Sequence, residues 1–168
     1  MENEKIIKLK KNNVLRLEIE TEEGIKTGEY LEFDLEDIEL PLKYAELIEE
    51  DKKNKKWLRD EQIIIDRRED VQIKGELMSK NTMDKFKALE TFFKKEVEIY
   101  NGFLGENGVQ KLLNGQKVGW TTLEMVDEII EKQIVPYLDL TLKNINDKIK
   151  EKYGQAVEKQ KKVLEVDE

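Results

Sequence analysis

Glycine and asparagine are concentrated in one stretch of the chain, and this stretch constrains the fold more than any other. Five of the nine glycines lie between Gly102 and Gly119, and three Asn-Gly pairs occur in the same stretch. Both residue types tolerate positive φ, so such pairs break or turn the chain. The apolar residues between the pairs need a buried environment. We therefore predict a tight corner that joins two long helices and contains one short helix, at about residues 106–114.

The residues assigned to this structural corner are glycines and their apolar neighbours: Gly102, Phe103, Leu104, Gly105, Gly108, Leu112 and Gly115. Gly105 is expected just past the end of a helix, where a positive φ is common and where Asn would be tolerated better than Val. The series G-x-x-G-x-x-G is not a P-loop, because no Gly-Lys-Ser/Thr follows, and it is not a dinucleotide fingerprint, because a helix precedes it. Glu106 also places negative charge where an RNA-binding loop would hold phosphate.

Composition restricts the classes of function. The chain has 168 residues, of which 40% are charged, and its net charge is -8. That length fits one ordinary domain, and the high charge is typical of long helices with wide solvated faces. Phosphate binding needs a concentrated basic surface, so we expect no nucleic-acid partner.

Cysteine and histidine are both absent. Disulfides, ordinary zinc sites and Ser-His or Cys-His nucleophilic systems are therefore excluded. An enzyme built from this chain would depend on carboxylates, Lys, Tyr or Ser. We assign no catalytic, cofactor-binding or metal-ligating residues, and we assign no partner-binding residues either.

The first residues, 1–11, are charged and lack the apolar core of a secretory signal. The chain also contains no apolar run long enough to span a membrane. We therefore expect a cytoplasmic protein that does not bind membranes.

The N-terminal part, residues 1–40, is predicted to be a small β-unit. Residues 1–13 are interpreted as a weak strand or a loose arm. Beyond them, apolar and polar residues alternate twice, with a turn at Glu23-Gly24 between the two segments, as in a β-hairpin or small meander with one wet face. Two strands alone are marginal in water, so their apolar face must meet a helix or another chain. The inward residues would be Leu15, Leu17, Ile19, Leu31, Phe33 and Leu35.

Acidic residues crowd the exit from this unit, at Asp34, Glu36, Asp37 and Glu39. We interpret them as a solvated turn before a helix, because calcium-loop spacing is missing. Pro41 suits the first turn of that helix. The helix is predicted to continue past Trp57, with a break near Asn54 as an alternative. The run Ile63-Ile64-Ile65 fits either the end of the helix or a strand, and 66–80 is expected to be a connection around Gly75.

The clearest helix in the sequence is capped by Asn81 or Thr82. Its apolar side chains recur every three or four positions, and core packing explains them better than a ligand pocket. This stripe consists of Phe86, Leu89, Phe93, Val97, Tyr100 and Leu104, and Phe92, Ile99 and Phe103 widen it.

After the corner, Thr121 and Glu124 are predicted to form a capping box. The helix should bend or restart at Pro136, which has no amide hydrogen. Residues 151–168 are predicted to be a charged tail, either a frayed helix or disordered, after a helical domain at 41–150. The fold class is therefore mainly α with a small N-terminal antiparallel β-hairpin, an α+β arrangement. The buried stripe of the last helix would begin with Leu123, Val126, Ile130 and Ile134. Beyond Pro136 the same apolar stripe is continued by Tyr137, Leu138, Leu142, Ile145 and Ile149.

Two segments resemble a known family over about residues 14–150. The first is Glu39-Leu40-Pro41-Leu42-Lys43-Tyr44 after a short β-unit. The second is the helix end and short helix spelled Tyr100-Asn101-Gly102-Phe103-Leu104-Gly105-Glu106-Asn107-Gly108-Val109-Gln110-Lys111-Leu112-Leu113-Asn114-Gly115. Together they are similar to the tail assembly chaperones of long-tailed phages and of phage-derived contractile particles of Gram-positive bacteria. In such proteins Leu/Phe-Gly-Glu-Gly follows the helix, so Asn107 is an extra residue here.

The resemblance implies a non-catalytic cytoplasmic protein. It would keep the tape-measure protein soluble and help tail-tube protein polymerise around it, and a longer frameshifted product would accompany it. A homo-oligomer stays open. The alternatives are a small structural particle component, such as a tail or head-completion protein, and a carboxylate-based enzyme that uses a divalent metal.

Overall fold

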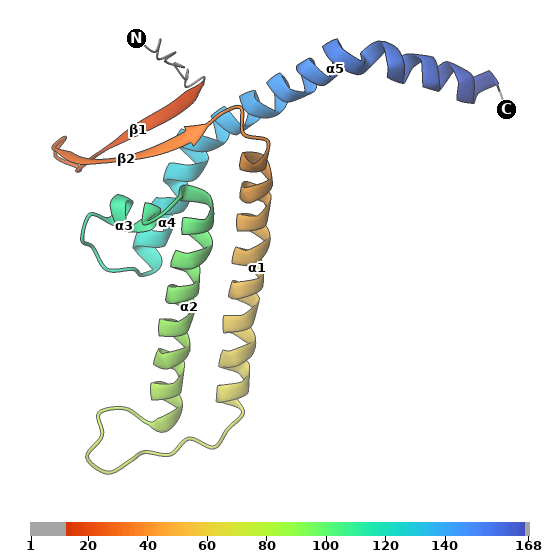
Figure 1. The fold of residues 1–168 in the computed structure, drawn as a ribbon. Helices are drawn as coiled ribbons and strands as arrows, with labels where there is room; N and C mark the ends of the chain where they lie inside the picture. Colours follow the sequence, from red (N-terminus) through yellow and green to blue (C-terminus); the bar gives the residue numbers. More distant parts are fainter. Residues whose placement is uncertain (1–12, 167–168) are drawn as a thin grey trace, which may run out of the picture.

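The computed structural model describes residues 13–166, with side chains to Gly154. The fold is mainly α with a two-stranded antiparallel hairpin at its start, as predicted (Figure 1). Residues 1–12, interpreted above as a strand or an arm, lie outside the described residues. The elements are β1 (Val14–Glu20), β2 (Lys26–Asp34), α1 (Glu39–Asp66), α2 (Lys80–Leu104), α3 (Gly108–Leu113), α4 (Trp120–Ile129), the π-helical turn η1 (Ile130–Ile134) and α5 (Val135–Val166).

The hairpin follows the predicted alternation. Leu17 pairs with Leu31 and Leu15 with Phe33, so apolar side chains face each other on the inner side. Leu31 and Phe33 are buried. The ring of Phe33 lies 5.8 Å from that of Phe103, at the end of α2. The inner face of the two strands therefore packs on the helices, as such a small sheet requires.

Helix α1 is continuous past Trp57 as predicted, and the alternative of a break near Asn54 is wrong. An asparagine within a helix weakens it when its side chain competes for nearby backbone groups. Here the Asn54 side chain is buried and donates across to α2 instead, to the carbonyl of Phe92 at 3.2 Å and to Glu96 Oε1 at 2.6 Å. The isoleucines at 63–65 end the helix, and of these three only Ile65 is buried.

Helix α2 begins two or three residues earlier than predicted, and its cap is Ser79. The Ser79 hydroxyl accepts the amide hydrogen of Thr82 at 3.3 Å. Asn81 has a different role: its side chain donates to the carbonyls of Ile65 and Arg68, each at 3.1 Å. Asn81 therefore binds one carbonyl in the last turn of α1 and one just beyond it, and joins the two helix ends at the tip of their hairpin.

The buried face of α2 matches the predicted stripe only in part: Phe92, Tyr100, Phe103 and Leu104 are buried as expected. Phe86 is 58% exposed, and Phe93 is only partly buried. Glu96 also lies on the buried face of α2. The spacing of apolar residues could not predict this, because glutamate is charged. Helix α1 covers one side of α2 and Trp120 covers another, with its ring 5.1 Å from that of Phe92. The residues of α2 that this arrangement buries are Asn81, Ala88, Phe92, Glu96, Tyr100, Phe103 and Leu104.

Helix α4 begins at Trp120, so the predicted capping box of Thr121 and Glu124 is wrong. The amide of Gly119 donates to the Thr122 hydroxyl at 2.8 Å instead. The predicted buried stripe of Leu123, Val126, Ile130 and Ile134 is confirmed. The π-helical turn η1 ends at Ile134, two residues before Pro136, and α5 begins at Val135. Such turns accommodate a missing backbone hydrogen bond.

Helix α5 is long, and its C-terminal part extends away from the other elements (Figure 1). Its first turns pack against the body, and it then extends alone past the β2–α1 connection (Figure 1). Its backbone is helical to Val166, so residues 151–166, part of the segment predicted to be a frayed helix or a disordered tail, continue α5 without a break.

Candidate functional site

The glycine corner, residues 102–115, contains the backbone conformations that the sequence suggests. Gly105 ends α2 with φ 95° and ψ 177°, and its amide donates to the carbonyl of Asn101 at 3.0 Å. Asn107 and Asn114 adopt the left-handed conformation on either side of α3. The pair Asn101-Gly102 lies within α2, so its predicted break is wrong.

The Asn101 side chain fixes the corner, and the sequence analysis did not identify it. Its Oδ1 accepts the amide hydrogen of Val109 at 2.8 Å, and its Nδ2 donates to Gln110 Oε1 at 3.0 Å. Asn101 thereby satisfies an amide in the first turn of α3 from the last turns of α2. The Asn-Gly pair suggested a flexible backbone at this point, whereas Asn101 contributes through the hydrogen bonds of its side chain.

Close packing explains Gly108. A Cβ at this position would lie 2.4 Å from the Cβ of Leu104, so any side chain would clash with the end of α2. The Phe103 ring contacts Tyr44 of α1 at 5.4 Å, which joins the corner to a third element. Leu112 is partly buried against the core, and Gly115 has a positive φ. The corner is therefore a packed structural joint and not a loop open to a phosphate.

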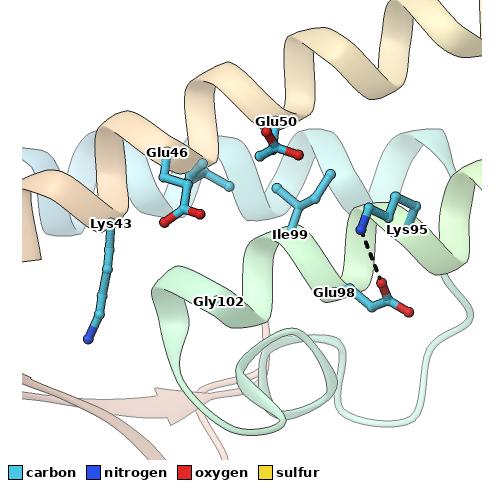
Figure 2. A pocket seen from close by; sticks show the side chains of 8 residues that line it. Lys43, Glu46, Glu50, Lys95, Glu98, Ile99 and Gly102 are labelled. Carbon is cyan, nitrogen blue, oxygen red and sulfur yellow. Dashed lines mark hydrogen bonds and ion pairs between the residues drawn. The ribbon is translucent and has the colours of Figure 1, made fainter.

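A groove of about 220 Å³ runs between α1 and α2 beside Gly102 (Figure 2). Glu46 and Glu50 of α1 stand opposite Lys95 and Glu98 of α2, and Lys95 binds Glu98 of its own helix at 3.4 Å. Its apolar lining consists of Leu47 and Ile99. Charges that pair along their own helices contribute little. We therefore interpret this groove as a solvated seam between two helices.

A buried polar cluster lies deeper between α1, α2 and α4. Glu96 is 1% exposed, accepts a hydrogen bond from Asn54 and faces Asp51 of α1. The pKa of Glu96 is raised to about 7, mainly by burial and also by the charge of Asp51, while the hydrogen bond from Asn54 acts in the opposite direction. Nearby, Tyr100 donates its hydroxyl hydrogen to Asp127, and burial raises the pKa of this tyrosine. This cluster is closed to a substrate.

Acidic side chains do not assemble a metal site in the part of the chain that the structure describes, where no group of three or more suitable ligands occurs. At the hairpin exit, Asp34 accepts the amide hydrogen of Glu36, and Asp37 accepts that of Glu39, both at 2.9 Å. These carboxylates organise the turn before α1, as interpreted from the sequence.

A hollow with a volume of about 510 Å³ lies between this turn and α5. We call it the α5 hollow. Leu35 and Ile38 line one wall, and Ile145 and Ile149 of α5 line the other. A single ion pair, Lys148 to Glu36 at 3.6 Å, bridges the walls. The rest of the lining is polar and includes Asp147 and Glu151 of α5. An open depression that combines apolar side chains with polar groups is a common form of binding site.

The apolar face of α5 continues outward from this hollow. Four residues, Leu142, Ile145, Ile149 and Tyr153, follow one another at spacings of three or four and make up what we call the α5 stripe. Leu142 is 45% exposed, Ile149 50% and Tyr153 61%. The stripe and the α5 hollow together form the candidate site, a surface suited to another protein chain.

No family model, curated protein or solved structure matches this chain. In the described residues, no helix combines the length and apolar character required to cross a bilayer.

Proposed function

We propose that this protein is a non-catalytic assembly chaperone of the phage-tail type, which acts in the bacterial cytoplasm. It would bind the tape-measure protein and promote polymerisation of the tail-tube protein around it. The resemblance of the 39–44 and 100–115 segments supplies the identity of these partners. The observation that carries the proposal is the α5 stripe, an apolar helix face that projects from the body with no described residue covering its outer half.

The arrangement of polar groups favours binding over catalysis. The carboxylates with an unusual environment, Asp51 and Glu96, lie inside the helix packing, and Glu96 is 1% exposed. A general acid or base must come within hydrogen-bond reach of its substrate. An exposed apolar face beside a highly charged surface, in contrast, suits a chain that keeps an apolar client in solution.

Co-expression tests the proposal. The genes beside this one should encode a tail-tube protein and a very long tape-measure protein. We expect the tape-measure protein to be insoluble alone, soluble with this chain, and recovered in a complex with it. The variant Ile149→Ser should weaken that complex. The matched variant Ile48→Ser, at a similarly exposed position on α1, should leave it intact. The proposal would be refuted if the tape-measure protein stayed insoluble with the wild-type chain as well as with each of the two variants.

Particle composition separates the chaperone from a structural component. Mass spectrometry of purified particles should find the tube and tape-measure proteins but not this chain, because a chaperone leaves before assembly is complete. Stoichiometric recovery of the chain in finished particles would instead identify it as a structural tail or head-completion protein.

A further inference from the structure

We propose that residues 5–11 of the chain bind in the α5 hollow of the same molecule. We call these residues the basic segment, because they combine four lysines with three large apolar side chains in the sequence Lys5-Ile6-Ile7-Lys8-Leu9-Lys10-Lys11. The inference goes beyond the proposed function and does not depend on it. Three observations carry it: the place where the described residues begin, the side chains that line the hollow, and the length of chain available.

The described residues begin at the α5 hollow itself. Asn13, the first of them, lines the hollow together with Glu36. Two hydrogen bonds hold Asn13 there. Its side chain donates to Glu36 Oε1 at 3.0 Å, and its carbonyl accepts the amide hydrogen of Leu35 at 3.0 Å. The basic segment ends two residues before Asn13 and is therefore tethered to the wall of the hollow.

The charged lining of the hollow is mainly acidic. Among the described residues that line it, Glu36, Asp147 and Glu151 are acidic and Lys148 is basic. Lys148 binds Glu36 at 3.6 Å, so its charge is already opposed. The four lysines of the basic segment therefore complement this lining. The lining does not include the other α5 lysines whose side chains are described, Lys143, Lys150 and Lys152.

The turn between β2 and α1 adds to the negative charge. Asp34 and Asp37 accept hydrogen bonds from backbone amides, which are neutral, so these bonds leave both negative charges in place. The turn leads into the hollow at Leu35, Glu36 and Ile38. A basic occupant is attracted to these carboxylates, and an acidic one is repelled.

The apolar part of the lining needs an apolar occupant. Ile38 on one wall is 66% exposed, and Ile149 on the other wall is 50% exposed. The side chains of Ile6, Ile7 and Leu9 can remove this surface from water, which lysines alone would leave exposed. The basic segment therefore matches the hollow in both of its properties, apolar surface and negative charge.

The tether is long enough to cross the hollow. An extended chain spans at most about 3.5 Å per residue, so Leu9 reaches up to about 14 Å from Asn13 and Ile6 up to about 25 Å. The α5 part of the lining, residues 144–151, is about 10 Å long. A short tether also holds the basic segment near the hollow at an effective concentration on the order of millimolar, so weak binding is sufficient.

Amide hydrogen exchange of the full-length chain, measured by mass spectrometry, tests the inference. A segment that binds the folded hollow slows exchange in the α5 residues that form it, because these residues must release the segment before they unfold. Lys8→Glu with Lys10→Glu should therefore make the amides of residues 144–151 exchange at least about threefold faster. Exchange at the wild-type rate in this variant would overturn the inference.

A matched variant controls for net charge. Lys52→Glu with Lys87→Glu changes the net charge by the same amount, at exposed lysines on α1 and α2, and should leave exchange at 144–151 unchanged. Acceleration equal to that of the Lys8→Glu, Lys10→Glu variant would overturn the inference, because the effect would then come from total charge.

Reversing the charges on both sides tests direct contact. Asp147→Lys with Glu151→Lys should accelerate exchange, and adding Lys8→Glu with Lys10→Glu to it should slow exchange again. The effect of the new lysines on α5 itself is present in both proteins and cancels in the comparison. Failure of the fourfold variant to exchange more slowly than the Asp147→Lys, Glu151→Lys variant would overturn the inference.

Dilution identifies the molecule that supplies the segment. Protection of residues 144–151 should be the same at all protein concentrations, because the basic segment belongs to the same chain. Protection that is lost on dilution would show that a second copy supplies it, and would overturn binding within one molecule.

Discussion

Asn54 of α1 donates a side-chain hydrogen to Glu96 of α2 over 2.6 Å, in an interface where both side chains are buried. Beside them, the buried Asp51 Oδ1 has no hydrogen-bond partner among the described residues. A protonated Glu96 can donate to Asp51 while it still accepts from Asn54. The cluster is therefore complete when Glu96 is neutral, and ionisation leaves two facing carboxylates.

The stability of the protein should depend on the ionisation of Glu96. Its pKa is raised to about 7 in the folded state, mainly by burial, from 4.5 in the unfolded chain. Between these values the folded state binds more protons than the unfolded state, so this group's contribution is complete below about pH 4.5 and is lost as pH rises through about 7. We expect a loss on the order of 2–3 kcal/mol across that window.

Urea unfolding of wild type and Glu96→Gln from pH 5 to pH 8 measures this loss. Glutamine keeps the acceptor for Asn54, supplies a donor for Asp51 and cannot ionise. The variant should lose less stability than wild type as pH rises, and should exceed it by about 1–2 kcal/mol at pH 8. If the free energy of unfolding changed with pH in the same way for both proteins, ionisation of Glu96 would not affect stability and the prediction would be wrong.

The cluster of Asp51, Asn54 and Glu96 could not be predicted from the sequence. The hairpin and the stripe of α4 followed from the spacing of Leu, Ile and Val, because burial of apolar surface decides both. Asn54, Asn81 and Glu96 lie in or beside the α1–α2 packing because each finds a partner on the other helix. A pattern within one helix contains no information about such a partner.

The rotation of the buried face of α2 predicts a contrast between two adjacent phenylalanines. Phe92 is fully buried, while Phe93 is partly buried against Phe92 and Trp120. Phe92→Ala should cost about 3–5 kcal/mol, and Phe93→Ala should cost clearly less, about 1–2 kcal/mol. Chemical denaturation of both variants tests the assignment, and a larger loss for Phe93→Ala would restore the face expected from the sequence.

Asn101 should act as a cap for α3. Replacing it with Ala removes the acceptor for the Val109 amide and should cost about 0.5–2 kcal/mol. Asn101→Asp keeps that acceptor and should cost less. Asn114→Ala is unsuitable as a control, because Asn114 has a positive φ. Equal losses for Ala and Asp at position 101, measured by urea unfolding, would contradict the capping role.

The candidate site illustrates a second limit. The spacing of Leu138, Leu142, Ile145 and Ile149 was recognised from the sequence as one continuous apolar stripe, and it is one in the structure. The pattern could not show that cover from the body ends near Leu142, because the tertiary arrangement determines where α5 leaves the bundle. One amphipathic pattern therefore serves as core in its first half and as open surface in its second.

Gly105 provides the sharpest test of the corner. The sequence suggested that Asn would be tolerated there better than Val, as in a left-handed cap. The observed φ of 95° and ψ of 177° lie in a different region, which is essentially restricted to glycine. Gly105→Asn and Gly105→Val should therefore both cost about 1–3 kcal/mol. A Cβ at this position meets no atom within 4 Å, so the loss would come from the backbone alone.

Gly102 is the matched control for this prediction, because it lies three residues earlier in the helical part of α2 and a Cβ there also meets nothing within 4 Å. Gly102→Ala should raise stability by about 0.5–1 kcal/mol, since alanine favours the helix. Thermal melts of the three variants, with and without a nucleotide, decide between a structural joint and a phosphate-binding loop. A loop would keep its stability in the Gly105 variants and lose nucleotide binding. A structural joint loses stability at position 105, gains it at 102, and shows no shift with nucleotide in any variant.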